Sequence, residues 1–216
     1  LSGNNGKRVY EINSRGKLVQ TLSTTKPLKG SDLHTNLDIE AQKSAAKFLG
    51  KRRGAVVAID LDSGGINVLY SSPTFSINKF SNGMNEDDFQ DLINDPDKPF
   101  FNRALKGRYP PASTIKPAIG MFGLSNNIVN WDFEIKDPGF FTLPETGRVF
   151  RGWRKGGHGK IDMHKAFLVS SNTYFFSLAY QADIEKLSNF LTSLGFGQQV
   201  CFDCFDEDQG LVPTPE

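Results

Sequence analysis

Two strand-like runs joined by a glycine-containing turn constrain the fold of this chain most. Residues 55–60 (AVVAID) and 66–70 (INVLY) are rich in apolar and β-branched residues, which favour strands. Between them lies the string Asp-Ser-Gly-Gly at 62–65, whose small residues tolerate the positive φ angles of a hairpin turn. The sequence therefore predicts an antiparallel hairpin at this point.

Helical patterns follow the hairpin. A long excursion over residues 72–111 is rich in Pro, Asn, Asp and Gly and contains one short helical candidate, residues 87–93. Beyond it, apolar residues recur at helical spacing in the segments 113–124, 174–182 and 184–194, the last of which ends at Gly195. Strands that precede a helical middle predict a mixed α/β or α+β fold, with helices inserted between sheet strands.

The first 50 residues predict a second hairpin and a capped helix. Alternating stretches at 8–12 and 17–22 flank Asn-Ser-Arg-Gly, which favours a turn. A linker-like stretch with Pro, Gly and charged residues follows, and a domain boundary is expected near residue 30. Asp38 can then cap a helix that ends near Gly50.

Composition excludes several classes of function. The 25 basic and 24 acidic side chains give a net charge of +1, so we expect no nucleic-acid partner. The longest apolar runs are far shorter than the roughly 20 residues that span a bilayer. Because the chain begins at Leu1 with no leader-like segment, we expect an internal fragment whose membrane anchor lies elsewhere.

The two cysteines, Cys201 and Cys204, form a C-x-x-C string. No second pair completes a four-thiolate zinc site, and the first cysteine does not open a predicted helix, as a redox site of this kind requires. We therefore expect ordinary thiols or one local disulfide, with no catalytic or metal-binding role.

Five Ser-x-x-Lys strings occur in the chain, and at most one of them can form a catalytic pair. They begin at Ser14, Ser23, Ser44, Ser76 and Ser113. The first crosses a turn, the second lies beside a linker proline, the third falls inside the helix predicted after Asp38, and the fourth falls in an irregular segment. Only the last opens a predicted helix, which selects Ser113 and Lys116.

The spacing of this pair suits acyl transfer. Positions i and i+3 share a helix face, so the Lys116 amine can lie near the Ser113 hydroxyl. A serine is a weak nucleophile until a base takes its proton, and Lys serves only if burial or nearby positive charge lowers its pKa from about 10.4. Ile115 and Pro117 suit such an enclosed site. The alternative is a helix-capping serine beside a solvated lysine.

Residues 109–117, YPPASTIKP, resemble the active-site segment of class B penicillin-binding proteins, especially the elongation-specific penicillin-binding protein 2 group. Further strings resemble the same family, namely NDP at 94–96, FNRA at 101–104, DPG at 137–139, Trp153, and GHG at 157–159. The resemblance covers nearly the whole chain. It implies a penicillin-binding protein/serine β-lactamase-like fold, an antiparallel sheet with an inserted helical subdomain, incomplete in this chain. Residues 1–30 would end the N-terminal pedestal and its linker, and residues 31–216 would begin the transpeptidase domain.

The family's second motif is matched by Ser170-Ser171-Asn172, which begins 57 residues after Ser113. The resemblance implies that Ser170 shuttles a proton between Lys116 and the leaving amine, while Asn172 hydrogen-bonds the substrate or a β-lactam side chain. A polar helix start is the alternative. The family's third motif, Lys-Thr-Gly or Lys-Ser-Gly, does not occur in the 216 residues, so we expect it beyond Glu216.

Some relatives in this family bind zinc through two Asp, one His and one Cys. Asp137 and His158 match two of these ligands, but Gly152 and Ser171 stand where the other two belong. A structural zinc ion needs about four protein ligands. We therefore expect no metal and no other cofactor.

The resemblance implies a peptidoglycan D,D-transpeptidase that cross-links stem peptides through an acyl-enzyme on Ser113 and is acylated by β-lactam antibiotics. It implies work at the periplasmic face of the bacterial inner membrane, beside a membrane glycosyltransferase and shape-determining proteins. Two alternatives remain open from the sequence. One is a β-lactamase or D,D-carboxypeptidase-type acylase, and the other is a non-catalytic penicillin-binding or scaffold fragment, which the missing third motif favours.

Overall fold

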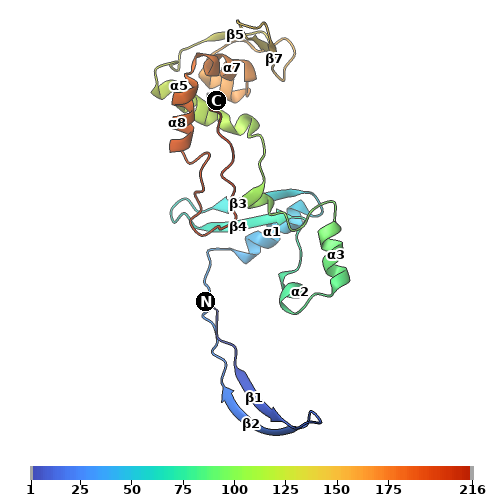
Figure 1. The fold of residues 1–216 in the computed structure, drawn as a ribbon. Coiled ribbons are helices and arrows are strands. Elements are labelled where there is room, and N and C mark those ends of the chain that lie inside the picture. Colours follow the sequence, from blue (N-terminus) through green and yellow to red (C-terminus); the bar gives the residue numbers. More distant parts are fainter. Residues whose placement is uncertain (1, 215–216) are drawn as a thin grey trace. The chain divides into compact units, whose positions relative to one another are not determined.

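A computed structural model describes residues 2–214 of the chain, which divides into two units, Leu1–Pro99 and Phe100–Glu216. Figure 1 shows the first unit in blue to green and the second in green to red. Every paired strand in the described residues belongs to a two-stranded antiparallel sheet. No helix in these residues is long and apolar enough to cross a bilayer.

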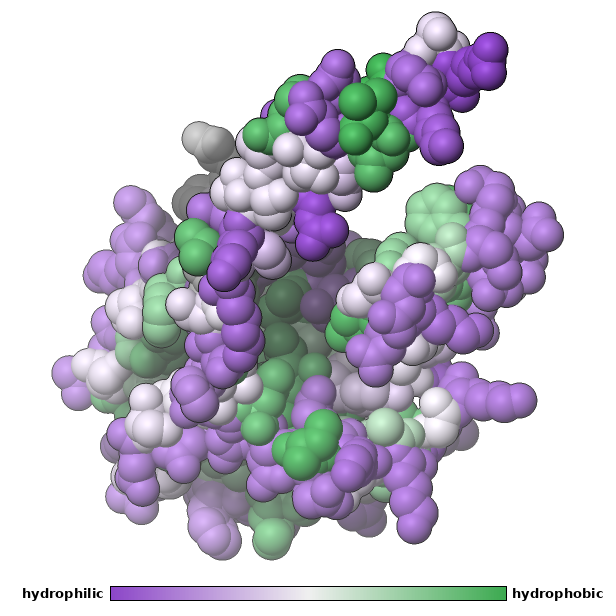
Figure 2. Space-filling model, turned by 90° about the horizontal axis from the view of Figure 1, so that it is seen from below, coloured by the Kyte–Doolittle hydropathy of each residue, from purple (hydrophilic) through white to green (hydrophobic). Residues whose placement is uncertain are grey.

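The first unit begins with the predicted N-terminal hairpin. Strand β1 (Lys7–Ile12) pairs with β2 (Leu18–Thr25). The side chain of Asn13 accepts hydrogen bonds from the backbone N–H groups of Arg15 and Lys17, so it fixes the turn through a local side-chain bond. Apolar side chains on both strands remain exposed, and on the face shown in Figure 2 hydrophobic and hydrophilic residues are interspersed.

The second predicted hairpin is also confirmed. Strand β3 (Gly54–Ile59) pairs with β4 (Ile66–Ser72). At the turn, the Asp60 carboxylate accepts hydrogen bonds from the Ser63 backbone N–H at 2.8 Å and from the Ser63 hydroxyl at 3.0 Å. Both bonds lower the pKa of Asp60, and the bond from the Ser63 backbone N–H contributes most. The Asp60 carboxylate that holds the turn is thus ionised at neutral pH.

Helix α1 (Ile39–Leu49) begins and ends as the sequence predicts. Asp38 caps it by accepting from two backbone N–H groups, and Gly50 ends it with a φ of +56°. Gln42 joins the helix to β4, because its side-chain oxygen accepts from the Leu69 N–H at 2.8 Å and its amide donates to the Leu69 carbonyl at 3.2 Å. The Gln42 amide thus pairs with both backbone groups of Leu69, as a residue of a neighbouring strand would.

Two short helices complete the first unit. The predicted candidate is confirmed as α3 (Glu86–Asn94), with Asn85 as its N-cap. Helix α2 (Ile77–Ser81), capped by Ser76, was not predicted. The segment 72–111 is therefore more regular than its Pro, Asn, Asp and Gly content indicated. One capping side chain at each helix, Ser76 for α2 and Asn85 for α3, accepts a hydrogen bond from the first turn.

The second unit is mainly helical. Its helices are α4 (Arg103–Lys106), the 3₁₀ turn η1 (Ala112–Ile115), α5 (Lys116–Ser125), α6 (Met163–Leu168), α7 (Asn172–Gln181) and α8 (Ile184–Ser193). Its strands are β5 (Ile135–Asp137) with β8 (Gly159–Ile161), and β6 (Phe140–Thr142) with β7 (Val149–Arg151). Helices α5, α7 and α8 confirm the three long helical predictions. The strands, each three residues long, were not predicted.

Helix α5 lies against both parts of the core of this unit. One cluster of buried side chains contains Val129, Ile161, Met163, Ala166, Tyr174, Phe175 and Leu178, and the other contains Ala118, Phe122, Leu187 and Leu191. Ala118 and Phe122 belong to α5, and Ile119 of the same helix packs against both clusters. The position of the first turn of α5 is thus set by packing on two sides.

Two glycines allow this helix to approach its neighbours closely. A Cβ atom added at Gly120 would lie 2.7 Å from the Phe167 ring, and one added at Gly123 would lie 2.8 Å from a methyl group of Leu178. Because real Cβ contacts are not this short, larger residues would push α5 away from α6 and α7. The two glycines therefore fix the distance between Lys116, at the start of α5, and the segment that joins α6 to α7.

Candidate active site

The segment around Ser113 turns sharply before it becomes helical. Ser113 lies in the 3₁₀ turn η1, and Lys116 is the first residue of α5. The predicted helix therefore begins as a tighter turn, and Ala112 just before the serine has a φ of +49°. A left-handed φ is costly for a residue with a Cβ and persists only where the surroundings enforce it. The Ser113 side chain is exposed, while Lys116 is only 7% exposed.

The second segment is the connection between α6 and α7. Ser170 has a φ of +50°, the next residue, Ser171, is the N-cap of α7, and Asn172 is the first residue of that helix. Backbone hydrogen bonds hold the connection, from Ser170 N–H to the Phe167 carbonyl at 3.1 Å and from Ser171 N–H to the Ala166 carbonyl at 2.9 Å. Two of the four described non-glycine residues with positive φ thus lie at this site.

The Lys116 amine joins the two segments. Its Nζ donates to the Ser170 carbonyl at 2.7 Å, to Ser170 Oγ at 3.0 Å and to Asn172 Oδ1 at 2.7 Å, and it lies 5.5 Å from the centre of the Phe175 ring. These acceptors match the three N–H donors of an ammonium group. Burial nevertheless lowers the pKa of Lys116, because removal from water disfavours the charged form.

Ser170 also reaches the serine of the first segment. Its hydroxyl donates to Ser113 Oγ at 3.0 Å. The four side chains selected from the sequence therefore converge in one hydrogen-bonded chain. We expected Lys116 to lie directly beside the Ser113 hydroxyl, but in the described structure the two groups are joined through Ser170. This arrangement can carry a proton between a hydroxyl and an amine.

Comparison with known proteins identifies the family of the chain. The family model described as the penicillin binding protein transpeptidase domain matches residues 54–216. The chain belongs to this family. The predicted transpeptidase fold is confirmed.

Individual penicillin-binding proteins are similar along the chain. The peptidoglycan D,D-transpeptidase MrdA of Acinetobacter baumannii is 43% identical over 216 residues, which cover all of this chain and 32% of that protein. Penicillin-binding protein 2 of Pseudomonas aeruginosa, solved in complex with WCK 5153, has a TM-score of 0.82 and 36% identity over 87% of this chain and 43% of its own. A complex between penicillin-binding protein 2 and MreC from Helicobacter pylori has a TM-score of 0.81 and 32% identity, covering 98% of this chain and 39% of its own. The chain thus spans about a third of the length of the curated relatives it matches.

The residues compared with the family's zinc ligands form a hydrogen-bonded cluster. Asp137 Oδ2 lies 2.9 Å from His158 Nδ1 and 2.8 Å from the Ser171 hydroxyl. In residues 2–214, no third His, Cys, Asp or Glu joins Asp137 and His158 in a group that could hold a metal ion. Because Ser171 contributes a hydroxyl rather than a thiolate, the donor set does not fit a four-ligand zinc ion.

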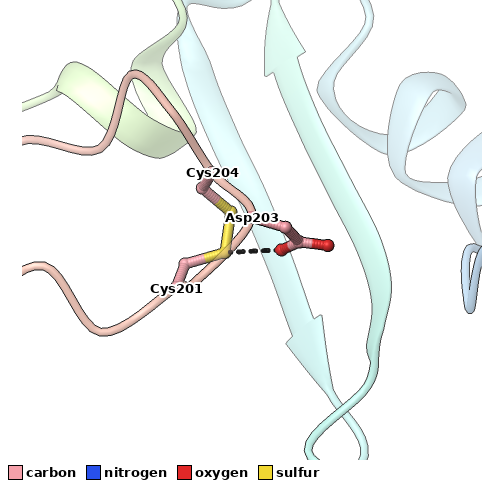
Figure 3. Close-up of side chains that lie close together, drawn as sticks. All are labelled: Cys201, Asp203 and Cys204. Carbon is pink, nitrogen blue, oxygen red and sulfur yellow. Dashed lines mark hydrogen bonds between the residues drawn. A yellow bond between two sulfur atoms is a disulfide. The ribbon is translucent and has the colours of Figure 1, made fainter.

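The two cysteines form a local disulfide in a loop, with their Cα atoms 5.3 Å apart. Figure 3 shows the Cys201 sulfur directed toward the Asp203 carboxylate, which lies 3.3 Å away. The local disulfide that the sequence left open is therefore present. These three residues are the one His, Cys, Asp and Glu group of metal-binding size within the described part of the chain. With its sulfurs bonded to each other, the pair has no free thiolate to bind a metal ion.

Proposed function

We propose that this chain carries the nucleophile and the base of a peptidoglycan D,D-transpeptidase. Ser113 Oγ attacks the carbonyl carbon of the penultimate D-Ala in a stem peptide, the peptide bond to the terminal D-Ala breaks, and that residue leaves as the free amine. An amine from a second stem peptide then attacks the acyl-enzyme and releases Ser113. β-Lactam antibiotics acylate the same serine. The observation that carries this proposal is the hydrogen-bonded chain from Lys116 through Ser170 to Ser113.

The proton follows this chain. As described, Lys116 donates to Ser170 and Ser170 donates to Ser113. When Lys116 is neutral, rotation of the two hydroxyl groups reverses both bonds, and the proton of Ser113 passes toward the amine as Oγ attacks. Ser170 then delivers a proton to the nitrogen of the leaving D-Ala. The lowered pKa of Lys116 supports this role, because it increases the neutral fraction of the amine near neutral pH.

Asn172 has a separate role in the proposal. Its Oδ1 accepts from Lys116 at 2.7 Å, which directs its amide N–H groups elsewhere. These donors suit a carbonyl oxygen of the stem peptide or of a β-lactam side chain. The turn at Ser113 adds backbone N–H groups at a helix start, which favour the oxyanion of the tetrahedral intermediate.

We extend the proposal to the setting of the whole protein. We assign residues 1–30 to the end of the N-terminal pedestal and its linker, and residues 31–216 to the first part of the transpeptidase domain. By family analogy we place the whole protein at the periplasmic face of the inner membrane, with its anchor in a segment outside these residues. The Helicobacter pylori complex with MreC supports a shape-determining partner, and a membrane glycosyltransferase is proposed by family analogy.

Cross-linking by the complete protein tests the proposed function. The parent and Ser113→Ala would be incubated with lipid-linked peptidoglycan precursor and a glycosyltransferase, the glycan digested with a muramidase, and the cross-linked muropeptides measured by chromatography and mass spectrometry. We expect cross-linked dimers with the parent and none with the variant, at equal glycan synthesis. Equal amounts of dimer from both proteins would overturn the assignment.

A further inference from the structure

Asp137, at the end of β5, is a buried carboxylate that makes no contact with the proposed reacting atoms. It is 2% exposed. Its Oδ1 accepts from the Gly139 N–H at 2.7 Å, and its Oδ2 accepts from the Ser171 hydroxyl at 2.8 Å and from His158 Nδ1 at 2.9 Å. Burial opposes ionisation, but these hydrogen bonds outweigh it, so the pKa of Asp137 is lowered. The group is therefore an anion that the Gly139 N–H, His158 and Ser171 hold in place.

Ser171 links this anion to the proposed active site. Its side chain is 1% exposed, and its hydroxyl donates to Asp137 while accepting from the Tyr174 N–H at 3.2 Å. The residues on either side of it, Ser170 and Asn172, supply all three acceptors of the Lys116 amine. A shift of Ser171 would therefore displace both neighbours together.

The conformation of Ser170 makes this support necessary. Its φ of +50° costs about 1–2 kcal/mol relative to a right-handed conformation, so a freed segment would relax away from it. Trp153 holds the chain just before it, by donating from Nε1 to the Val169 carbonyl at 3.0 Å. The Trp153 ring packs on His158, with ring centres 5.2 Å apart. Asp137 thus organises contacts on both sides of Ser170.

His158 is oriented by the same carboxylate. An ionised carboxylate only accepts hydrogen bonds, so Nδ1 is the protonated nitrogen that faces Asp137. The other nitrogen, Nε2, is buried with no hydrogen-bond partner in the described structure. The imidazole therefore completes the hydrogen bonding of Asp137 and fills the space against Trp153.

We propose that Asp137 is a positioning residue for acyl transfer, which holds Ser170 and Asn172 against Lys116 through the Ser171 hydroxyl and does so without a metal ion. This inference rests on the proposed function. A hydrogen-bonded carboxylate thereby fixes the Ser-Ser-Asn segment at 170–172. Asp137 of the Asp-Pro-Gly string and His158 of the Gly-His-Gly string act together in this role.

The test measures how fast a fluorescent penicillin acylates the complete protein. The rate constant is determined per acylable site, so that an unfolded fraction does not affect it. Asp137→Asn, Ser171→Ala and the double variant are compared with the parent. Because a misplacement of about 1 Å can cost about a hundredfold in rate, we expect each single variant to be about ten- to a hundredfold slower. Since both act through one contact, the double variant should be no slower than the slower single variant.

Asp183→Ala is the matched control. Asp183 caps α8 by accepting from the Lys186 N–H, and it makes no contact with Lys116, Ser170 or Asn172 in the described hydrogen bonds. Its removal should lower the melting temperature, as the loss of a cap does, while the rate constant stays within about twofold of the parent. Where Asp137→Asn does not fold, the contrast between Ser171→Ala and Asp183→Ala decides.

The outcomes separate this inference from the proposed function. If the parent is acylated but Asp137→Asn and Ser171→Ala react at the parent rate, the positioning role is wrong and the proposed function stands. Effects that multiply in the double variant would also overturn the role of the shared contact. If a chelator slows the parent, a metal ion and not the hydrogen bonds holds the segment. If the parent is not acylated at all, both proposals fail.

Discussion

The exchange Asn172→Asp gives a sharp test of Lys116 as the base. The two side chains have nearly the same shape, so the change places a negative charge where an amide oxygen now lies 2.7 Å from the Lys116 amine. The carboxylate favours the ammonium form, and the lowered pKa of Lys116 should rise again. The base would then be protonated at a pH where the parent reacts.

The size of the effect follows from the distance. An opposite charge within about 4–6 Å shifts a pKa by about 1–3 units, and this pair lies well inside that range. Far below the pKa, each unit lowers the neutral fraction of the amine about tenfold. We therefore expect Asn172→Asp to be acylated about ten- to a thousandfold more slowly near neutral pH, with the rate rising toward the parent value as the pH increases.

The assay is the acylation rate constant with a fluorescent penicillin, measured as a function of pH for the parent, Asn172→Asp and Asn172→Ala. The alanine variant removes the proposed substrate contact without adding charge, so its rate should fall at every pH. The aspartate variant should move the rising limb to higher pH. A fall of equal size at all pH values for Asn172→Asp, or no change at all, would refute Lys116 as the titrating base.

Three further predictions concern single side chains. Lys116→Arg should keep the fold but lose acylation, because guanidinium stays protonated at every usable pH; intact-mass spectrometry would show a penicilloyl adduct if this were wrong. Tyr174→Phe should lower the free energy of unfolding by about 1 kcal/mol, since it removes the hydrogen bond to the Phe133 carbonyl. Burial is the main reason that the pKa of Tyr174 is raised to about 12, so thermal melts should show the same loss from about pH 6 to pH 9. The pKa of Asp137 is lower in the native state than in the unfolded chain, so the stability that the Asp137 carboxylate contributes is complete above its ordinary pKa of 3.8 and is lost on acidification. Asp137→Asn should therefore flatten the acid side of a profile of melting temperature against pH. An unchanged slope would contradict this.

Local signals predicted much of the fold. The two hairpins have alternating or β-branched runs on either side of turn-forming residues, and α1 has a capping Asp38 and a terminating Gly50 in sequence. The strands β5 to β8 escaped prediction because three residues are too few to establish a period. Their pairing depends on the core that packs against them, which no local pattern reveals.

The active site was likewise predicted only in part. Ser113 and Lys116 follow from one string at a helix start, and their partners Ser170 and Asn172 were found through family resemblance. The order of contacts could not be found, because the position of Ser170 between Lys116 and Ser113 depends on a left-handed φ and on the meeting of two segments 57 residues apart. The contact between Asp137 and Ser171 was missed for a similar reason. It joins residues 34 apart, and the sequence drew attention to Asp137 only as part of a family string and as a candidate metal ligand.

The most direct test of the central claim is to find where benzylpenicillin attaches. The complete protein and Ser113→Ala would be incubated with the antibiotic and examined by intact-mass spectrometry, followed by proteolysis and peptide sequencing. We expect one penicilloyl adduct on the parent, located on Ser113, and none on the variant. An adduct on another residue, an adduct that persists in Ser113→Ala, or an unmodified parent would contradict the account.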